Sequence, residues 1–300
     1  MSGSASALAA ACALAAGLLA ATPAVASEAQ REPFVRGLLF RLDRPGLAPS
    51  YVFGTMHSGD PRVTTLPRPV ADAFAVAKTL AVENHLAEGD AGRFFEAAQF
   101  DDGRRLTEFF DAASLSAIRT ALGGAAPPDD VLLHLKPWAV LLKLIEQPIA
   151  DGETLDAKLL AEAPRRRLAV VGLELPDEQI SAFDAIPLAT QVALVRFVLV
   201  HRDELVREHD DVLAAWLDRD LAKLVALSSA PGRRHPEMAP HFAELTRHLI
   251  VNRSVQMAHR LFLPLRAGRV FVAVGALHLH GKRGLLVLLR DQGYRVSVVY

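Results

Sequence analysis

Cysteine is almost absent from this chain of 300 residues, since Cys12 is the only one. It lies in an N-terminal run that we expect to be removed, so the mature protein would contain neither disulfides nor thiolate ligands. An excess of one charge is also lacking. The chain has 33 Lys and Arg against 34 Asp and Glu, which gives no electrostatic reason to expect a nucleic acid as partner. Hydrophobic residues at 51% and charged residues at 22% are typical of a globular chain and exclude a disordered one.

The N-terminal residues have the pattern of a secretory signal peptide. Residues 5–26 carry no charged side chain, and Ala24 and Ala26 place small residues where signal peptidase cleaves. We predict a signal peptide over residues 1–26 and a periplasmic or secreted mature protein. Retention of this Ala-rich run as a weak anchor is the alternative. No later segment is apolar for long enough to cross a bilayer, so we expect no stable membrane insertion after cleavage.

Two stretches of the chain repeat one pattern, in which a strand leads into a G-x-x-H turn and is followed by a helix and a second strand. The first copy consists of 50–53, the turn Gly54 to His57, 69–78 and 79–83. The second consists of 269–274, the turn Gly275 to His278, 285–292 and 294–300. An earlier strand, 37–42, is expected to pair with the first copy as a hairpin. Two copies of one unit predict a sheet assembled from two similar halves.

The middle of the chain is predicted to be mainly helical. Apolar residues have helical spacing over 106–122, 131–144, 154–162, 176–183, 187–217, 221–228 and 242–261. One β-branched run, 168–172, is expected to add a strand. We therefore predict an α/β (α+β) protein with a mixed central β-sheet, in which residues 27–300 form a single domain. The sheet halves are expected over about 34–90 and 264–300, with a large helical insertion over about 91–263.

His57 and His278 occupy matched positions, each just after a strand and before a helix. Such positions gather at the carboxyl edge of an α/β sheet, where ligands bind. Two imidazoles and one carboxylate would form a three-ligand metal site with an open position for water. Glu83 ends the last strand of the first copy and is the expected carboxylate. A structural hydrogen-bonding role for each histidine, and a surface position for Glu83, are the alternative interpretations.

The same segments resemble a known protein family. YVFGTMH (51–57), LAVE (80–83) and VAVGALHLHGKRGLLVLLRDQGYRV (272–296) are similar to the TraB/GumN family. Its fold relatives include the Tiki metalloproteases and the erythromycin-esterase and ChaN-like proteins. The segments 135–140, 170–187 and 251–261 resemble the middle of that family, so the likeness extends over nearly all of the mature chain.

The resemblance implies a set of site residues. His57, Glu83 and His278 match the two histidines and the glutamate on which proteolysis by Tiki proteins is thought to depend. They would hold a divalent metal ion, and with nitrogen and oxygen donors Mn, Co or Zn are the candidates. Arg253 matches the basic position of the family and would act beside Glu83 as a catalytic residue by stabilising an oxyanion.

Several points about this site stay open at the level of sequence. Glu83 could be a metal ligand or a general base, and if it does not ligate, His280 or His85 would be needed as a further ligand. Asn84 stands where relatives often carry a second acid, which leaves that additional ligand undefined. The Arg-Asn order of the family is reversed around Arg253, which could instead be an exposed cation whose stem covers apolar surface.

The function predicted from these residues is that of a metal-dependent hydrolase of the metalloprotease type. Its substrate would be a peptide or another small molecule. A non-catalytic protein that binds haem, metal or a peptide is one alternative, and a hydrolase of small esters or lactones is another. His201 and His209 flank Glu204 and Glu208, but their spacing is not H-E-x-x-H, so we do not predict a zincin helix there.

Overall fold

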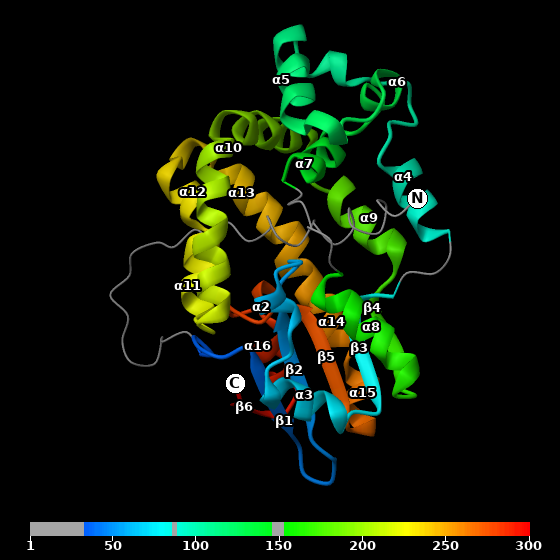
Figure 1. Cartoon of the computed structure of the whole chain (residues 1–300), viewed down its shortest axis with the longest axis vertical. Coiled ribbons are helices and arrows are strands. Elements are labelled where there is room, and N and C mark those ends of the chain that lie inside the picture. Colours follow the sequence, from blue (N-terminus) through cyan, green and yellow to red (C-terminus); the bar gives the residue numbers. More distant parts are fainter. Residues whose placement is uncertain (1–32, 86–88, 146–152) are drawn as a thin grey trace.

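A computed structural model describes residues 33–85, 89–145 and 153–300. The predicted signal peptide, residues 1–26, lies outside these ranges. A six-stranded sheet occupies the lower half of the molecule in Figure 1, and a group of helices lies beyond one end of its strands. The α/β class and the mixed sheet predicted from the sequence are confirmed.

The sheet consists of β1 (Leu39–Asp43), β2 (Ser50–Thr55), β3 (Thr79–Asn84), β4 (Ala169–Glu174), β5 (Val270–Gly275) and β6 (Arg295–Val298). The strands lie in the order β4-β3-β5-β2-β1-β6. β4, β3, β5 and β2 are mutually parallel, whereas β1 is antiparallel to both β2 and β6. The two G-x-x-H strands, β2 and β5, are therefore direct neighbours, although they come from opposite ends of the described chain.

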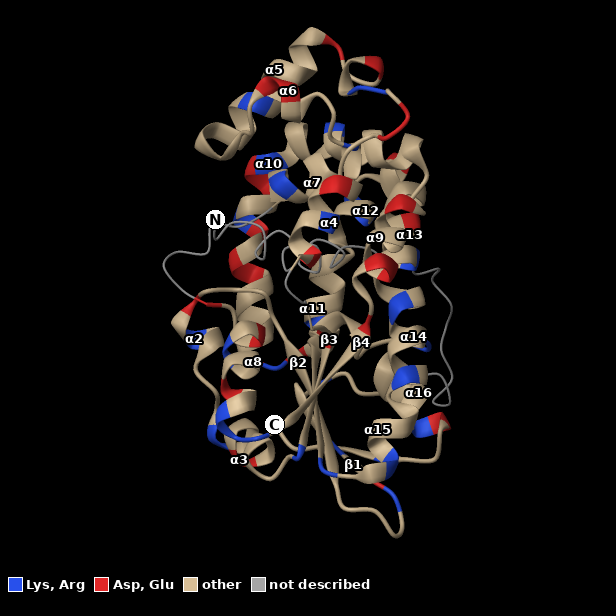
Figure 2. Ribbon diagram, turned by 90° about the vertical axis from the view of Figure 1, so that its right-hand side faces the viewer, with Lys and Arg blue, Asp and Glu red and all other residues tan. Residues whose placement is uncertain are grey.

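The central strands are buried on both faces, which explains their continuous apolar sequences. The first five residues of β5 are fully buried, as are the four inner residues of β3. Helices cover the two faces of the sheet, as Figure 2 shows. On one face lie α2 (Pro61–Thr64), α3 (Arg68–Ala75) and α8 (Leu155–Arg165). On the other lie α14 (Arg253–Arg260), α15 (Phe262–Ala267) and α16 (Leu285–Asp291).

Most of the remaining helices form a group with a hydrophobic core of its own. They are α4 (Asp90–Ala97), η2 (Leu106–Glu108), α5 (Ala112–Leu122), η3 (Gly123–Ala125), α6 (Asp129–Leu132), α7 (Pro137–Ile145), α9 (Pro176–Asp184), α10 (Leu188–Leu217), α12 (Ala230–Arg234), η4 (Pro236–Met238), α13 (Ala239–Thr246) and the π-helix η5 (Arg247–Asn252). Helix α11 (Leu221–Ser228) packs instead with the core around the sheet, and the short η6 (Ala276–His278) follows β5. Trp138 is central to the helical core, since its ring stacks on Phe183 with the ring centroids 5.0 Å apart. Its indole N–H donates to Asp184 over 2.8 Å, which satisfies its polar atom.

The long helix α10 connects the two cores. Its first half packs Leu194 and Val195 into the helical core, and its second half packs Leu213 and Trp216 into the core around the sheet. The two halves meet at a kink at His201. Within the described ranges, no helix taken alone combines the length and the apolar composition that a membrane span requires. By length and composition only, α9 and α10 would meet that test as a pair bent by 83°.

Candidate functional site

The carboxyl ends of the four parallel strands point toward the group of helices (Figure 1) and carry the residues that the sequence singled out. Thr55 at the end of β2 lies opposite Gly275 at the end of β5, so the two G-x-x-H turns leave the sheet side by side. Gly54 permits this packing. A Cβ at this position would lie 2.7 Å from Cδ1 of Leu279 and 3.0 Å from Cα of Ala276, which no other residue type could accept without movement of the second turn.

His278 is almost completely buried, and its surroundings define its tautomer. Its Nδ1 lies 2.9 Å from Oγ of Ser254, whose hydroxyl proton is donated to the carbonyl of Ile250 over 2.7 Å. Oγ therefore accepts a hydrogen bond from Nδ1–H, and the lone pair of the imidazole is on Nε2. That Nε2 atom makes no hydrogen bond to the described residues and lies 3.7 Å from Oε1 of Glu83.

Glu83 is buried at the end of β3 and is ionised. Its Oε1 accepts the backbone N–H of Gly275 over 2.6 Å, and its Oε2 accepts from Arg253 over 2.8 Å. Burial alone would raise the pKa of Glu83. The nearby His278 imidazole, the Arg253 guanidinium, the His57 imidazole and the N–H of Gly275 outweigh burial and hold that pKa well below its usual value. The expectation that Glu83 is an exposed strand end is therefore excluded.

Arg253 is only 2% exposed, so it is not a surface cation. Its Nε and one terminal nitrogen donate to the two carboxylate oxygens of Glu174 over 2.8 and 2.5 Å. The same terminal nitrogen donates to Glu83, and the other donates to the carbonyl of Leu249 over 3.1 Å. The two buried carboxylates and the single guanidinium carry one net negative charge among them, a state that is costly without a nearby cation.

His57 lies beside a carboxylate that its sequence position does not reveal, at ion-pair distance but without the geometry of a hydrogen bond. Oδ2 of Asp156, in the first turn of α8, lies 3.1 Å from Nδ1 of His57, and Oδ1 accepts from the hydroxyl of Thr55 over 2.9 Å. A carboxylate beside Nδ1 is the arrangement that commonly orients metal-binding imidazoles with Nε2 as the ligand atom. Glu174 was missed as well, although it ends the apolar strand β4, next to the end of β3 that carries Glu83 as its penultimate residue.

His57 and His278 line one pocket at this edge of the sheet, which has a cavity volume of about 60 Å³ and opens to solvent. Its other lining residues are Thr55, Met56, His209, Val212, Trp216, Leu224, Ile250, Gly275, Ala276 and Leu277. Most of this wall is apolar, as in pockets that enclose a ligand and position it with a few polar groups. Of the reserve ligands, His85 is exposed after β3, and neither it nor His280 belongs to this lining.

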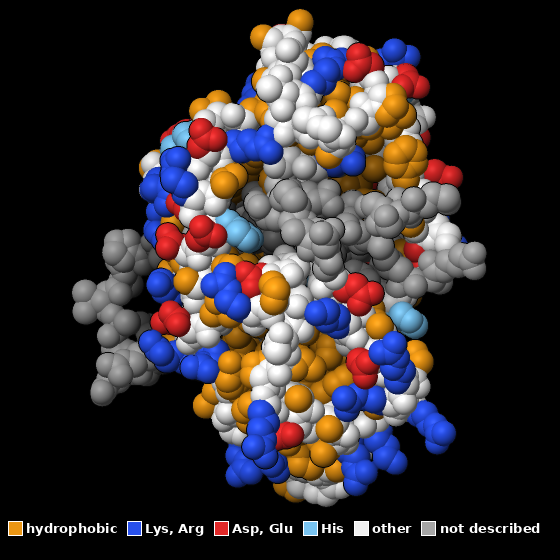
Figure 3. Space-filling view, viewed as in Figure 1, with side chains coloured by type: hydrophobic (Ala, Val, Ile, Leu, Met, Phe, Trp, Pro, Cys, Tyr) orange, Lys and Arg blue, Asp and Glu red, His pale blue; other side chains and the backbone are white. Residues whose placement is uncertain are grey.

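Basic side chains are unevenly distributed over the face of the molecule that Figure 3 shows. Figure 3 shows acidic and basic side chains interspersed over the upper and middle parts of the face in view. Lys and Arg gather at the lower end, which is the amino edge of the parallel strands in Figure 1.

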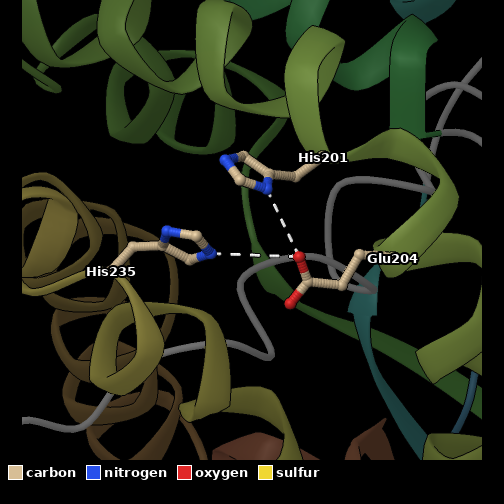
Figure 4. Close-up of side chains that lie close together, drawn as sticks. All are labelled: His201, Glu204 and His235. Atoms are coloured by element: carbon tan, nitrogen blue, oxygen red, sulfur yellow. Dashed lines mark hydrogen bonds and ion pairs between the residues drawn. The ribbon is translucent and has the colours of Figure 1, made fainter.

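A second cluster of potential metal ligands lies within the helices. His201, Glu204 and His235 have ligand atoms that all lie within 4.8 Å of one another, so this group could hold a metal ion. The three side chains come together at the kink of α10, as Figure 4 shows. The spacing of residues along one helix does not reveal this group. His201 and Glu204 lie in α10, whereas His235 follows α12.

Comparison with known proteins gives one match. The model of the TraB/PrgY/gumN family covers residues 38–298. This range contains both G-x-x-H turns, all six strands and the contacts of Arg253 described above. No curated protein matches the chain, and neither does any solved structure.

Proposed function

The chain belongs to the TraB/PrgY/gumN family, and on this basis we propose that it is a metal-dependent hydrolase that cleaves peptides at the carboxyl edge of its sheet. The relationship between His278 and Glu83 carries the proposal. A buried Nε2 lone pair faces an ionised carboxylate oxygen across 3.7 Å. Two such electron-rich atoms stabilise each other only if a proton or a metal cation lies between them.

Glu83 and His278 lie close enough together to share a divalent metal ion, whereas the ligand atoms of the described residues His57, Glu83 and His278 do not all lie within 4.8 Å of one another, so His57 would have to move to complete the site. Ligand bonds of about 2 Å from nitrogen and oxygen allow one ion to contact two atoms that are 3.7 Å apart. The net negative charge of Glu83, Glu174 and Arg253 favours a cation, and the donor atoms suit Mn, Co or Zn. His57, Glu83 and His278 would hold the ion. When bound, it would supply a Lewis acid for the scissile carbonyl and lower the pKa of a bound water.

Residues behind the ligands keep them in position. Asp156 and Ser254 contact the Nδ1 atoms of His57 and His278 and so fix both imidazoles with Nε2 as the ligand atom. We assign Arg253 the role of a positioning residue for Glu83. The oxyanion role expected from the resemblance requires a donor that faces the substrate, whereas all three guanidinium nitrogens donate to protein acceptors.

Glu83 is better suited to bind a metal ion than to transfer a proton. A carboxylate whose pKa is held well below the usual value is a weak base, and an effective general base has a pKa near the working pH. Beside His57 and His278, His209 is the remaining titratable residue among the described residues of the pocket. We propose that His209 transfers the proton, and that the apolar wall receives an apolar side chain of the peptide.

The test is to purify the exported protein, determine its metal content by elemental analysis, and measure cleavage of a fluorogenic peptide library with and without chelator. We expect bound divalent metal and peptide cleavage that chelator removes and added metal restores. The His278→Ala variant should lose both, whereas His259→Ala, at an exposed position of α14, should lose neither.

Parallel assays distinguish the alternatives. Turnover of small esters or lactones without peptide cleavage would reassign the substrate. A haem absorption band without turnover of any substrate would identify a binding protein. Unchanged cleavage by both His57→Ala and His278→Ala would remove the proposed site altogether.

A further inference from the structure

The kink in α10 is not caused by a proline or a glycine. His201 has φ −108° and ψ 16°, outside the helical region, yet neither proline nor glycine occurs in the surrounding residues 188–217. Sharp bends without these residues arise where a side-chain interaction competes with the helical hydrogen bonds. The side chain of His201 makes such interactions, since its ring stacks on Phe197 at 4.4 Å and lies 4.2 Å from the ring of His235.

One carboxylate oxygen faces both imidazoles. Oε2 of Glu204 lies 3.3 Å from Nδ1 of His201 and 3.9 Å from Nε2 of His235, as drawn in Figure 4. Ligand atoms of a tetrahedral zinc ion, with bonds of about 2 Å, are separated by about 3.3 Å. The first distance matches that value, and the second requires a movement of well under 1 Å.

Further groups orient these three ligands. Oε1 of Glu204 accepts from Nε of Arg234 over 2.6 Å, which turns Oε2 toward the imidazoles. Nδ1 of His235 lies 3.5 Å from Oε1 of Glu237, which leaves Nε2 as its ligand atom. Metal-binding histidines and carboxylates are commonly held in this way by groups behind them.

Glu208, behind the cluster, offsets the positive charge of Arg234, which would otherwise repel a metal ion. A terminal nitrogen of Arg234 also contacts Glu208, so its positive charge is shared between two carboxylates. Burial raises the pKa of Glu208, and Arg234 acts against this. Burial also acts to raise the pKa of Glu204, but Arg234 outweighs it and keeps Glu204 ionised.

From this geometry we propose a second divalent-metal site, formed by His201, Glu204 and His235, that fixes the bend of α10 against the turn between α12 and η4. Two imidazoles and one carboxylate select a borderline transition metal such as Zn²⁺, Co²⁺ or Ni²⁺ over Ca²⁺ or Mg²⁺, which prefer all-oxygen sites. The three side chains remain 21 to 29% exposed, so water can supply a further ligand.

The second metal site would also influence the shape of the pocket that His57 and His278 line. Beyond the kink, α10 carries His209, Val212 and Trp216 into the pocket wall. A metal ion at the kink would fix the direction of this half of the helix. The proposal does not depend on hydrolase activity, because it concerns a different set of ligands.

The experiment uses the full chain, stripped of metal by chelator and titrated with Co²⁺ by calorimetry and visible absorption. To isolate the second site, the titration is performed in the His57→Ala/His278→Ala background. We expect one equivalent of bound Co²⁺ in that background. Adding Glu204→Gln or His235→Ala should weaken it by at least about 100-fold, whereas adding His259→Ala should leave it unchanged.

Thermal unfolding provides a readout that is independent of activity. Saturating Zn²⁺ should raise the melting temperature of the His57→Ala/His278→Ala protein, because a ligand that binds only the folded state stabilises it. The increase should disappear with Glu204→Gln, which conserves side-chain volume. The inference is overturned if the background protein binds no Co²⁺, or if Glu204→Gln and His235→Ala both bind it as tightly as the background does.

Discussion

Nε2 of His278 lies 3.7 Å from Oε1 of Glu83, and both side chains are buried. The imidazole donates its Nδ1–H to Ser254, so the atom that faces the carboxylate has no proton of its own. Burial, aided by Arg253, holds the pKa of His278 below its usual value although Glu83 acts in the opposite direction. At neutral pH this gap is therefore better suited to a metal cation than to a proton.

Replacing Asp156 tests whether a carboxylate is required behind His57. Asp156→Asn retains the size of the side chain but removes the charge that orients the imidazole. We expect metal affinity at the sheet edge to fall by about 10- to 100-fold, as measured by competition with a chelating indicator. Asp72→Asn, on the exposed side of α3, should leave the affinity unchanged. Equal affinities for the two variants would contradict the role of Asp156.

Removing Glu174 should reduce stability strongly. Glu174→Ala leaves Arg253 buried with half of its carboxylate partners, and breaking a buried ion pair costs about 3–5 kcal/mol. The free energy of unfolding is measured by denaturant titration. Glu162→Ala provides the comparison, since its ion pairs with Arg165 and Arg166 are exposed and should contribute less than about 1 kcal/mol. A loss for Glu174→Ala no larger than that for Glu162→Ala would show that the buried network is not a stabilising unit.

Acidification should weaken metal binding before Glu83 is protonated. The pKa of His278 is lowered in the folded protein. The free energy of unfolding therefore has its full value above the pKa of His278 in the unfolded chain, which is about 6.5. That free energy decreases as the pH falls below about 6.5, because the unfolded chain then binds the proton more readily. Glu83 has a lowered pKa and stays ionised through this range.

Metal affinity and unfolding free energy measured from pH 8 to pH 5 test this dependence. Both should fall between about pH 6.5 and 5. His278→Gln should reduce the slope of the unfolding free energy in this range. Part of the slope should remain, because burial also lowers the pKa of His248. A slope identical to that of the unaltered protein would indicate that His278 does not titrate as described.

His209→Ala should separate catalysis from metal binding. If His209 transfers the proton, its removal lowers kcat by about 10²- to 10⁴-fold, while the metal content of the sheet-edge site is retained. Steady-state kinetics and elemental analysis of the same preparation provide the two measurements. His259→Ala is the matched control. A normal kcat for His209→Ala would assign proton transfer to another group.

Gly54→Ala should destabilise the protein because the added methyl group would overlap the second G-x-x-H turn. Forced overpacking of this kind costs about 1–3 kcal/mol. Gly92→Ala, in α4, is the comparison, since a Cβ there meets no atom within 4 Å and alanine favours a helix. Denaturant titration of both variants should show a loss for Gly54→Ala alone.

The fold was predictable where local pattern and burial agree. β2, β3 and β5 are short apolar runs that end at polar residues, and each formed where the sequence indicated. Division of the expected helix 242–261 into α13, the π-helix η5 and α14 was not predictable, because its apolar spacing is continuous. In the folded protein the side chains of Arg253 and Ser254 donate to the carbonyls of Leu249 and Ile250 in η5, contacts that the apolar spacing does not reveal.

The sequence indicated His57, Glu83 and His278 as candidate ligands, which stays a prediction, but it did not indicate the residues that contact them. His57 and His278 stand out because their motif recurs, whereas Asp156 and Glu174 act through contacts with residues 101 and 79 positions away in the chain. Such pairs have no sequence spacing of their own. The cluster at the kink was not predictable for the same reason, because His235 comes close to His201 and Glu204 of α10 only in the folded protein.

The adjacency of β2 and β5 also determines when the proposed site can first form during synthesis. Residues 50–55 can pair with residues 270–275 only after the latter have been synthesised. A ribosome-bound fragment that lacks β5 therefore cannot bring His57 and His278 together. Pairing across so much sequence is slow compared with local helix formation. A growing polypeptide would thus lack the proposed site until residues 270–278 have been synthesised and have folded against β2.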